Sequence, residues 1–347
     1  MSAGEPLDVK KLILPALFLA LVFGALIWRR PAAVEPQTLH GESMGTTWNV
    51  RLVGVEDAEV DGLGLLVQSE LDAIDGLMST WKPDSELSRF NAHELATPFP
   101  LSEESAEVLA LATDVNAGSG GAFDVTVGPA VAAWGFGAGA HEDPPTDEEL
   151  AALTRVVGFE KLRVDPGAAE ATKANPGVRV DLSAIAKGYA VDRVSAALLD
   201  AGHMNHLVEV GGEVVARGEK GEGRPWVVGI DKPLYEGREV QVALALSDMA
   251  LATSGDYRNF VDSYGERRQH TIDPRTLRPV DHDLASVSVI APSCAAADAW
   301  ATALMVMGAS KGKAVAERMP IEALFIVRGP DRFEETATSG FDDYRVE

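Results

Sequence analysis

The chain has 347 residues, enough for one large or two ordinary domains, and 46% of them are hydrophobic, enough for a substantial core. Its formal net charge of −23 argues against nucleic acid as a partner, and any phosphate-bearing ligand would need local compensation by a metal ion, a lysine or helix N–H groups. Cys294 is the only cysteine, which excludes an internal disulfide, a cysteine metal cluster and a lipid-modified cysteine near the N-terminus.

The first 35 residues differ from the rest of the chain. Lys10 and Lys11 precede an uncharged apolar run, residues 12–28, which Arg29, Arg30 and Pro31 follow. The run has about 17 residues, the lower limit for a membrane-spanning helix. A cleaved signal peptide would end in small residues, where this chain has Trp28 and two arginines. We therefore expect residues 1–35 to be an uncleaved membrane anchor with a linker, with a cleaved signal peptide as the alternative, and residues 36–347 to form one domain.

Hydrophobic spacing predicts the elements of the first half of this domain. Alternation in residues 40–53 indicates a strand that follows Met44-Gly45-Thr46. Residues 61–78 are expected to form an amphipathic helix, residues 79–91 a loop, and residues 102–116 a second helix capped by Ser102. A short helix is expected at residues 147–154.

The second half begins with residues 178–202, which are typical of a strand end that leads into a helix. Ser183 is the expected N-cap, and Gly202 follows the last periodic residue. Short β-rich runs separated by Gly or Pro then predict an antiparallel sheet, at residues 206–217, 226–230, 240–246, 249–253 and 285–290. A final helix is expected between the cap Ser293 and Gly308.

Three places could carry chemistry. Asp181, Lys187 and the free N–H groups of a helix start lie within seven residues, which suits a phosphate and a metal ion, although an Asp before a helix is often structural. Asp298 and Thr302 share a helical face and could bind a hard cation such as Mg²⁺, or form an ordinary polar face. His270 could be a general base or a structural histidine.

Trp81 also has two interpretations. In the predicted loop it could pack in the core, or it could be a stacking platform for a flat ring.

Taken together, residues 44–308 resemble the ApbE family, the FAD:protein FMN transferases formerly called thiamine-biosynthesis lipoproteins. The resemblance rests on the number and order of short motifs. They are Met44-Gly45-Thr46, residues 81–91, Gly120-Gly121-Ala122-Phe123-Asp124, Gly128-Pro129, Trp134-Gly135-Phe136-Gly137, residues 181–192, Gly211-Gly212, Ser254-Gly255-Asp256-Tyr257, residues 270–274, and Ala297-Asp298 through Thr302.

The resemblance implies an α+β fold related to the T-fold group, with antiparallel sheets packed against helices. It implies an enzyme that splits the pyrophosphate of FAD, transfers FMN to a Thr or Ser hydroxyl of an acceptor flavoprotein through a phosphodiester, and releases AMP. Mg²⁺ is the implied cofactor. The acceptor would carry a motif close to Asp-x-x-Ser/Thr-Gly/Ser-Ala-Thr, which this chain lacks.

The resemblance also implies roles for particular residues. His270 corresponds to the base toward the acceptor hydroxyl. Asp298, Thr302 and the carbonyl of Ala184 correspond to the metal ligands. The implied contacts to the flavin nucleotide are Met44, Trp81, Gly121, Ala122, Phe123, Asp181, Lys187 and Ile272.

Two features depart from the family pattern. Ala301 stands where some members have a further metal-binding Asp, and Leu277 with its neighbours replaces the usual Thr-Gly after the His-x-Ile-Asp-Pro run. The missing N-terminal cysteine agrees with a single-pass anchor in the inner membrane and a catalytic domain on the periplasmic side. A metal-dependent FAD pyrophosphatase and a non-enzymatic FAD-binding protein remain the alternatives.

Overall fold

The computed structural model describes residues 35–346 except 95, 138–139, 141–142, 258–259 and 264–265, and the side chains of residues 260–263 and 266–268 are not described either. The predicted anchor lies outside the described residues, apart from Glu35. None of the helices described between residues 35 and 346 has the length and hydropathy needed to cross a bilayer.

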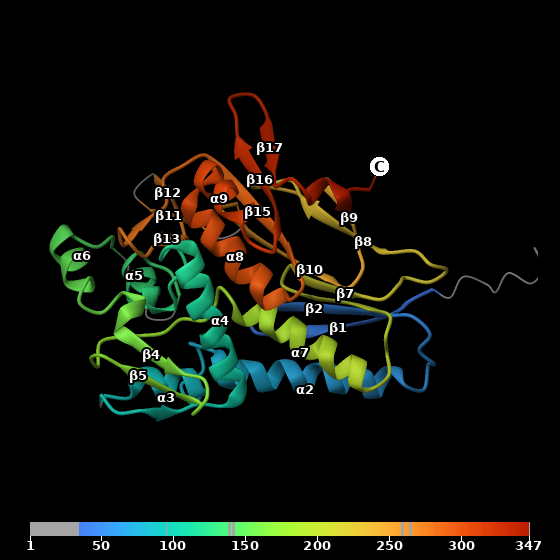
Figure 1. Cartoon of the computed structure of the whole chain (residues 1–347), viewed down its shortest axis with the longest axis horizontal. Helices are drawn as coiled ribbons and strands as arrows, with labels where there is room; N and C mark the ends of the chain where they lie inside the picture. The colour runs from blue at the N-terminus through green and yellow to red at the C-terminus, as the bar shows by residue number, and fades with distance from the viewer. Residues whose placement is uncertain are drawn as a thin grey trace, which may run out of the picture. The chain divides into compact units, whose positions relative to one another are not determined.

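An antiparallel sheet of eight strands is the centre of the fold (Figure 1). Every neighbouring pair in it is antiparallel, as the short β-rich runs predicted. In spatial order its strands are β1 (Gln37–Ser43), β2 (Thr46–Leu52), β6 (His206–Val210), β7 (Glu213–Arg217), β10 (Met249–Gly255), β15 (Leu284–Ala291), β16 (Glu322–Arg328) and β17 (Phe333–Ala337).

The central strands of this sheet are buried on both faces. In β7, Val215 belongs to the larger core while Val214 and Ala216 belong to a second core on the opposite face. Successive side chains of a strand point to opposite faces, so the sheet separates two cores. We call these the helix-covered face and the hairpin-covered face.

Helices cover the face that Val215 occupies (Figure 1). α7 (Ala186–Asp200) packs on β6 and β7, α8 (Cys294–Met307) on β10 and β15, and α2 (Val60–Met78) on β1 and α7. α8 also contacts α4 (Glu103–Ser119) and α9 (Ala309–Ala316). Because α8 has neighbours on nearly every side, its many alanines allow the close approach that larger residues would prevent.

A separate hairpin covers the other face. β8 (Trp226–Asp231) pairs with β9 (Val240–Leu246), and their inward side chains join the sheet and the 3-10 turn η3 (Phe341–Tyr344) in an apolar cluster. The largest fully buried side chain of this cluster is Trp226, whose indole N–H donates to the carbonyl of Arg217 at 2.9 Å.

Smaller elements complete the domain. They are α3 (Glu86–Ala92), β3 (Phe99–Pro100), η1 (Val125–Val127), α5 (Gly128–Ala133), α6 (Asp147–Leu153), η2 (Phe159–Lys161), β4 (Leu162–Asp165), β5 (Glu170–Lys173), β11 (Phe260–Ser263), β12 (Glu266–Gln269), β13 (Ile272–Asp273) and β14 (Arg278–Pro279).

The structure corrects three predictions about the elements. The strand predicted after Met44-Gly45-Thr46 is confirmed as β2, but the run from residue 40 also includes the end of β1, a separate strand. Residues 86–91 of the expected loop lie in α3, whose N-cap Ser85 accepts from Ser88 N. Residues 178–182 form no strand. Their backbone is bonded instead by the side chain of Asn91 and by the carbonyl of Val125, so no neighbouring strand is required.

Candidate active site

Two glycine-containing turns lie side by side at one end of the sheet. The β1–β2 turn has Met44 at φ 51° and Gly45 at φ 72°, and the β6–β7 turn has Gly211 and Gly212 at φ 62° and 108°. A Cβ on Gly211 would lie 2.9 Å from the Thr46 methyl group, so glycine is required there for contact as well as for conformation. Two motifs far apart in sequence, one around Thr46 and one around Gly211, thus meet at this end.

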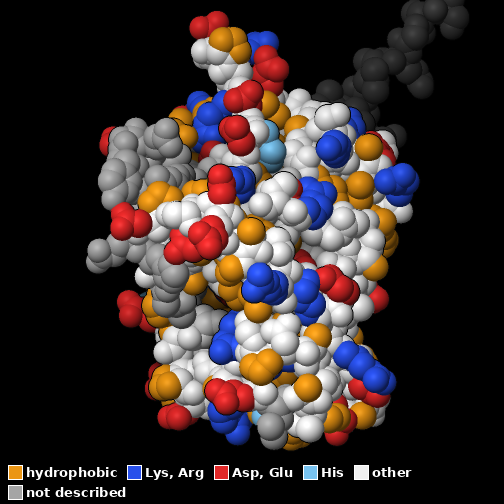
Figure 2. All heavy atoms as spheres, turned by 90° about the vertical axis from the view of Figure 1, so that its left-hand side faces the viewer, with side chains coloured by type: hydrophobic (Ala, Val, Ile, Leu, Met, Phe, Trp, Pro, Cys, Tyr) orange, Lys and Arg blue, Asp and Glu red, His pale blue; other side chains and the backbone are white. Residues whose placement is uncertain are grey.

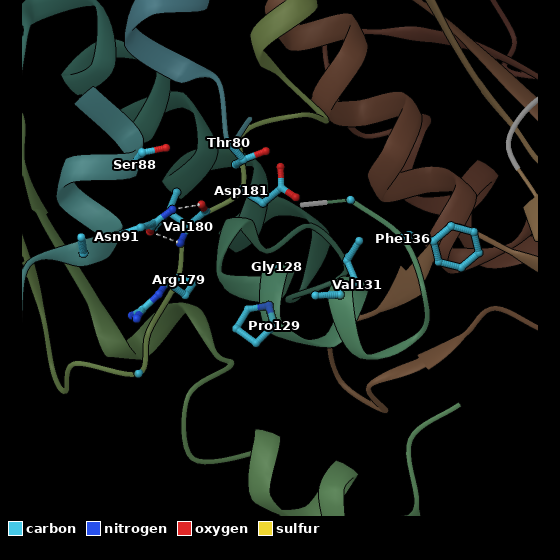
Figure 3. Close-up of a pocket in the computed structure, with 14 residues that line it drawn as sticks. Thr80, Ser88, Asn91, Gly128, Pro129, Val131, Phe136, Arg179, Val180 and Asp181 are labelled. Atoms are coloured by element: carbon cyan, nitrogen blue, oxygen red, sulfur yellow. Dashed lines mark hydrogen bonds between the residues drawn. The ribbon is translucent and has the colours of Figure 1, made fainter. Parts of the chain in front are cut away.

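The tryptophan-containing motif is attached to the segment before α7 by one asparagine. Asn91 Nδ2 donates to the carbonyl of Val180 at 2.8 Å, and Asn91 Oδ1 accepts from Val180 N at 2.7 Å (Figure 3). Behind it, the buried ammonium of Lys173 donates to the Asn91 carbonyl at 2.9 Å, and its burial lowers the pKa of Lys173 to about 8. Asn91 therefore fixes the backbone that presents Asp181.

The Gly120–Asp124 motif is also fixed by side chains. Asn116 Nδ2 donates to the Phe123 carbonyl at 2.7 Å, and Ser119 Oγ accepts from Phe123 N at 3.1 Å. The Ala122 and Phe123 side chains are buried, so a ligand can meet these two residues chiefly through their backbone, next to Gly121 at φ 79°.

A cavity of about 490 Å³ lies beside the Asn91–Val180 contact, and of the site residues predicted from the sequence only Asp181 lines it. Its wall includes Thr80, Gly128, Phe136, Arg179 and Asp181, and its lining residues come from three segments distant in sequence (Figure 3). The side of the protein that carries α5 and α6 is hollowed near mid-height, with hydrophobic side chains showing between basic ones (Figure 2). The cavity has the size and mixed lining of a small-molecule site.

The start of α7 differs from the prediction. The helix begins at Ala186, and its N-cap position is Ile185, with no side-chain cap. Ser183 is not the cap. Its backbone N–H donates to Asp181 Oδ1 at 2.9 Å, so the carboxylate of Asp181 forms the turn before the helix. The predicted end is confirmed, because Gly202 at φ 92° follows the last turn and His203 N donates to the Leu198 carbonyl.

Lys187, Glu213 and Asp298 form a charged cluster where α7, α8 and β7 meet, in which both acids are buried and the Lys187 side chain is 32% exposed. Lys187 Nζ lies 2.7 Å from Glu213 Oε1, and Asp298 Oδ2 accepts from Gly188 N at 3.1 Å. Burial lowers the pKa of Lys187, but the charges of Asp298 and Glu213 outweigh it and the pKa is raised. Burial and the nearby charge of Asp298 raise the pKa of Glu213 to about 7, and burial raises the pKa of Asp298. The cluster has one more acid than base.

The predicted metal ligands fit an oxygen-binding cation. Asp298 and Thr302 are one turn apart on α8, and Thr302 Oγ1 lies 3.2 Å from Ser254 Oγ of β10. Ala184 lies in the turn before α7, whose Gly188 bonds Asp298. Asp298 is only 5% exposed, and a cation would offset the cost of burying its charge. Among the described residues, no three His, Cys, Asp or Glu side chains cluster as a metal site, so the fit depends on hydroxyl and carbonyl oxygens.

His270 and Ile272 lie beside the cavity wall. The rings of His270 and Phe136 meet edge to face with centroids 6.3 Å apart. Ile272 packs with Ala130 and Leu277 in a small apolar cluster and is 5% exposed. Leu277, where the family pattern has glycine, adopts φ 59°, so the turn is kept and its side chain is buried in that cluster.

Trp81 is 74% exposed, which excludes the core interpretation. It follows Thr80, a residue of the cavity wall, and its backbone N–H donates to Ser79 Oγ at 3.2 Å. The stacking platform for a flat ring stays a prediction.

Sequence reasoning assigned no role to Asn91 or Glu213. Glu213 shares the helix-covered face with Val215, and a charged residue at an inward position of an apolar strand is a signal that could have identified it. Asn91 gives no comparable signal, because its partners on Val180 are backbone atoms far away in sequence.

The chain is similar to known proteins over most of its length. The model of the ApbE family matches residues 44–325. The chain is 43% identical over 314 residues to an FAD:protein FMN transferase of Vibrio cholerae serotype O1, covering 89% of this chain and 93% of the relative. Among solved structures, it is similar to the flavin transferase ApbE from Vibrio cholerae, with 42% identity and a TM-score of 0.81, covering 90% of this chain and 99% of that one. The apo form of the Pseudomonas stutzeri flavinyl transferase ApbE has 37% identity and a TM-score of 0.80, covering 90% and 97%.

Proposed function

This chain belongs to the ApbE family, and we propose that it transfers FMN from FAD to a Thr or Ser hydroxyl of an acceptor flavoprotein. The acceptor oxygen forms a bond to the phosphorus of the FMN half, the pyrophosphate P–O bond breaks, and AMP leaves with that oxygen. The product is a phosphodiester-linked FMN. The family and the enzyme class predicted from the sequence are confirmed by the curated relatives.

One observation carries the proposal. The segment from Val180 to Asp192 lines the cavity with Asp181 and then brings Lys187 and Gly188 against Asp298. A single stretch of chain thus connects a nucleotide-sized cavity to a cluster of charges whose two acids are buried. Phosphoryl transfer depends mainly on such positioning and on charge neutralisation.

We propose that Mg²⁺ is the cofactor and that Asp298, Thr302 and the Ala184 carbonyl supply its protein ligands. When bound, Mg²⁺ would neutralise the pyrophosphate charge in a chain whose net charge is −23. Lys187 contributes a further positive charge beside Asp298. Its bond to Glu213 orients the ammonium toward the cluster.

His270 takes the proton from the acceptor hydroxyl in this proposal. The His270 and Phe136 rings meet edge to face, with centroids 6.3 Å apart. Phe136 also lines the cavity, so the imidazole lies beside the space assigned to FAD. Met44, Trp81, Gly121, Ala122, Phe123, Asp181, Lys187 and Ile272 are proposed as the flavin-nucleotide contacts.

We further propose a location. The apolar run after Lys11 anchors the protein in the inner membrane as a single pass, and the domain from residue 36 onward works on the periplasmic side. The acceptor flavoprotein, with a motif close to Asp-x-x-Ser/Thr-Gly/Ser-Ala-Thr, is then reached from that side. Recovery of a soluble mature form that begins near Val34 would contradict the anchor.

The deciding experiment incubates the protein with FAD, Mg²⁺ and an acceptor bearing the motif, and measures the intact mass of the acceptor. A gain of one FMN is expected, with AMP in equal amount. The control acceptor carries Val in place of the motif Thr, which keeps the shape and removes the hydroxyl. Release of AMP at the same rate without acceptor would identify an FAD pyrophosphatase, and FAD binding without AMP release would identify a binding protein.

A further inference from the structure

Asp192 joins α7 to the start of α8. Its Oδ1 accepts from Cys294 N at 2.8 Å and its Oδ2 accepts from Ala295 N at 2.9 Å. The first N–H groups of a helix have no partner within the helix. Here a residue of another helix supplies two acceptors, and the remaining cap, Ser293 Oγ on Ala296 N, comes from the α8 segment itself.

One turn earlier on α7, a hydrogen bond between the same two helices runs the other way, from a backbone N–H of α7 to a carboxylate of α8. Gly188 N donates to Asp298 Oδ2 at 3.1 Å. A Cβ on Gly188 would lie 2.3 Å from the Cys294 carbonyl oxygen, so the helices are in direct backbone contact at this point. Each helix therefore gives one carboxylate to backbone N–H groups of the other, and the two bonded places are four residues apart on each helix.

Through this reciprocal arrangement, Asp192 can affect the position of Asp298 although Asp192 is not itself a proposed metal ligand. Asp298 follows Cys294 by four residues, so it lies about 6 Å further along α8. If the α8 start shifted relative to α7, Asp298 would move with it, away from Gly188 and Lys187. Misplacement of a reacting group by about 1 Å can reduce a rate by about a hundredfold.

We propose that Asp192 is a positioning residue that fixes the place of Asp298 and thereby sets the affinity of the Asp298–Thr302 site for a divalent cation. This rests on the proposed function, because it takes Asp298 as a metal ligand. Asp192 touches neither the cation nor FAD. It acts through the register between α7 and α8.

The test compares Asp192→Asn with Ser293→Ala. Asp192→Asn keeps the size of the side chain but presents an N–H₂ group to one of the two N–H donors. Ser293→Ala removes a cap from the same helix end without changing the bond between the helices. Binding of Mn²⁺, which reports on Mg²⁺ sites, is measured by electron paramagnetic resonance on the full-length protein with FAD absent and present, and thermal unfolding is measured alongside.

We expect both variants to lose thermal stability, and only Asp192→Asn to bind Mn²⁺ about tenfold more weakly, with a matching increase in the Mg²⁺ concentration that half-saturates FMN transfer. Equal Mn²⁺ affinities in the two variants, whether unchanged or lowered to the same extent, would overturn the proposal. Should Asp192→Asn fail to fold, Asp192→Glu keeps both acceptors on a longer side chain, and unchanged Mn²⁺ affinity in it would also overturn the proposal. Because Mn²⁺ binding is read without turnover, a wild-type protein that binds Mn²⁺ but transfers no FMN would contradict the proposed function alone.

Discussion

The two faces of the central sheet are built from the same strands but differ in what they bury. The helix-covered face buries the carboxylates of Glu213 and Asp298, with the half-buried Lys187 beside them. The hairpin-covered face is an apolar cluster around Trp226, Leu244 and Ile326. The backbone N–H and C=O groups of the strands are already paired within the sheet, whereas helix starts and glycine turns present free N–H groups.

That difference explains where the chemistry lies. Asp298 is stabilised by Gly188 N in the first turn of α7, and Asp192 by two N–H groups at the start of α8. The β8–β9 hairpin uses its N–H groups in its own ladder and has few to offer a buried charge. We infer that substitutions on the helix-covered face change catalysis, and that those on the hairpin-covered face change stability.

The largest expected effect is that of His270→Ala. Removal of a general base typically lowers the rate by about 10²–10⁴-fold. FAD binding should survive, and additional Mg²⁺ should restore nothing, because no ligand of the cation is lost. Titrating FMN transfer with Mg²⁺ checks this, and recovery at high Mg²⁺ would show that the role is wrongly assigned.

Asp298→Ala should lower FMN transfer by more than about a hundredfold. Mutation of a residue that only supports a metal ligand typically costs about 10–100-fold in activity, and loss of a ligand itself should cost more. Here high Mg²⁺ should restore part of the activity, because a weakened site fills at higher concentration. The same titration provides the contrast with His270→Ala. Failure of Mg²⁺ to restore any activity in a folded variant would remove Asp298 from the ligand set.

On the hairpin-covered face, Leu244→Ala should lower the free energy of unfolding by about 2–5 kcal/mol, because its side chain is fully buried. The kcat of FMN transfer at 25 °C should stay at the wild-type value. Urea unfolding and steady-state kinetics on one preparation measure both quantities. A reduced kcat in the folded variant would contradict the separation of the two faces.

His206 tests the polar contacts of the helix-covered face by pH. It is fully buried, with Nε2 2.8 Å from Ser195 Oγ of α7, and burial lowers its pKa from 6.5 to about 4. Between pH 6.5 and 4 the unfolded chain takes up a proton that the folded chain does not. The free energy of unfolding should therefore fall by up to about 3 kcal/mol as the pH drops through this window.

His206→Gln supplies the control for that measurement. It removes the ionisable group, so the slope of stability against pH between 6.5 and 4 should be smaller than in the wild type. Urea unfolding at several pH values compares the two proteins. Identical slopes would mean that other groups account for the acid sensitivity.

The smallest effect is expected for Trp81→Ala. Its exposed indole is proposed to stack on FAD, and an aromatic stack is worth about 0.5–1.5 kcal/mol beyond area burial, which corresponds to at most about tenfold in affinity. Stability should not change, because the side chain is 74% exposed. Fluorescence titration with FAD measures the affinity, and Lys82→Ala, which leaves the indole in place, is the neighbouring control.

The sequence predicts those features that repeat along the chain. The periodic helices α2, α4 and α8 were found close to their bounds, and the caps Ser102 and Ser293 are confirmed. Short α3 was missed because seven residues carry too little periodicity. The strand assigned to Val180 was wrong because Asn91, distant in the sequence, replaces a ladder partner.

In the candidate site, too, residues within sequence motifs were predicted, whereas contacts between residues distant in sequence were not. Motif order led to Lys187 and Asp298, which the structure brings together. Ser183 was predicted as the cap by residue type, but the N–H groups of Ile185 and Ala186, which a Ser183 cap would bond, donate to the carbonyl of Leu182 instead. Asp192 could not be found, because an Asp on an exposed helix face and an Asp that caps another helix look identical in one sequence.

The course of β1 has a practical consequence. The strand begins at Gln37 and reaches the Met44-Gly45 turn, next to Gly211, seven residues later. At about 3.4 Å per residue, the point where the chain enters the domain lies on the order of 24 Å from the end that carries the glycine turns. A tag, fusion partner or solid support attached ahead of Gln37 therefore joins the domain at the opposite end of β1, and immobilised enzyme prepared in this way should leave the glycine turns open to a large acceptor.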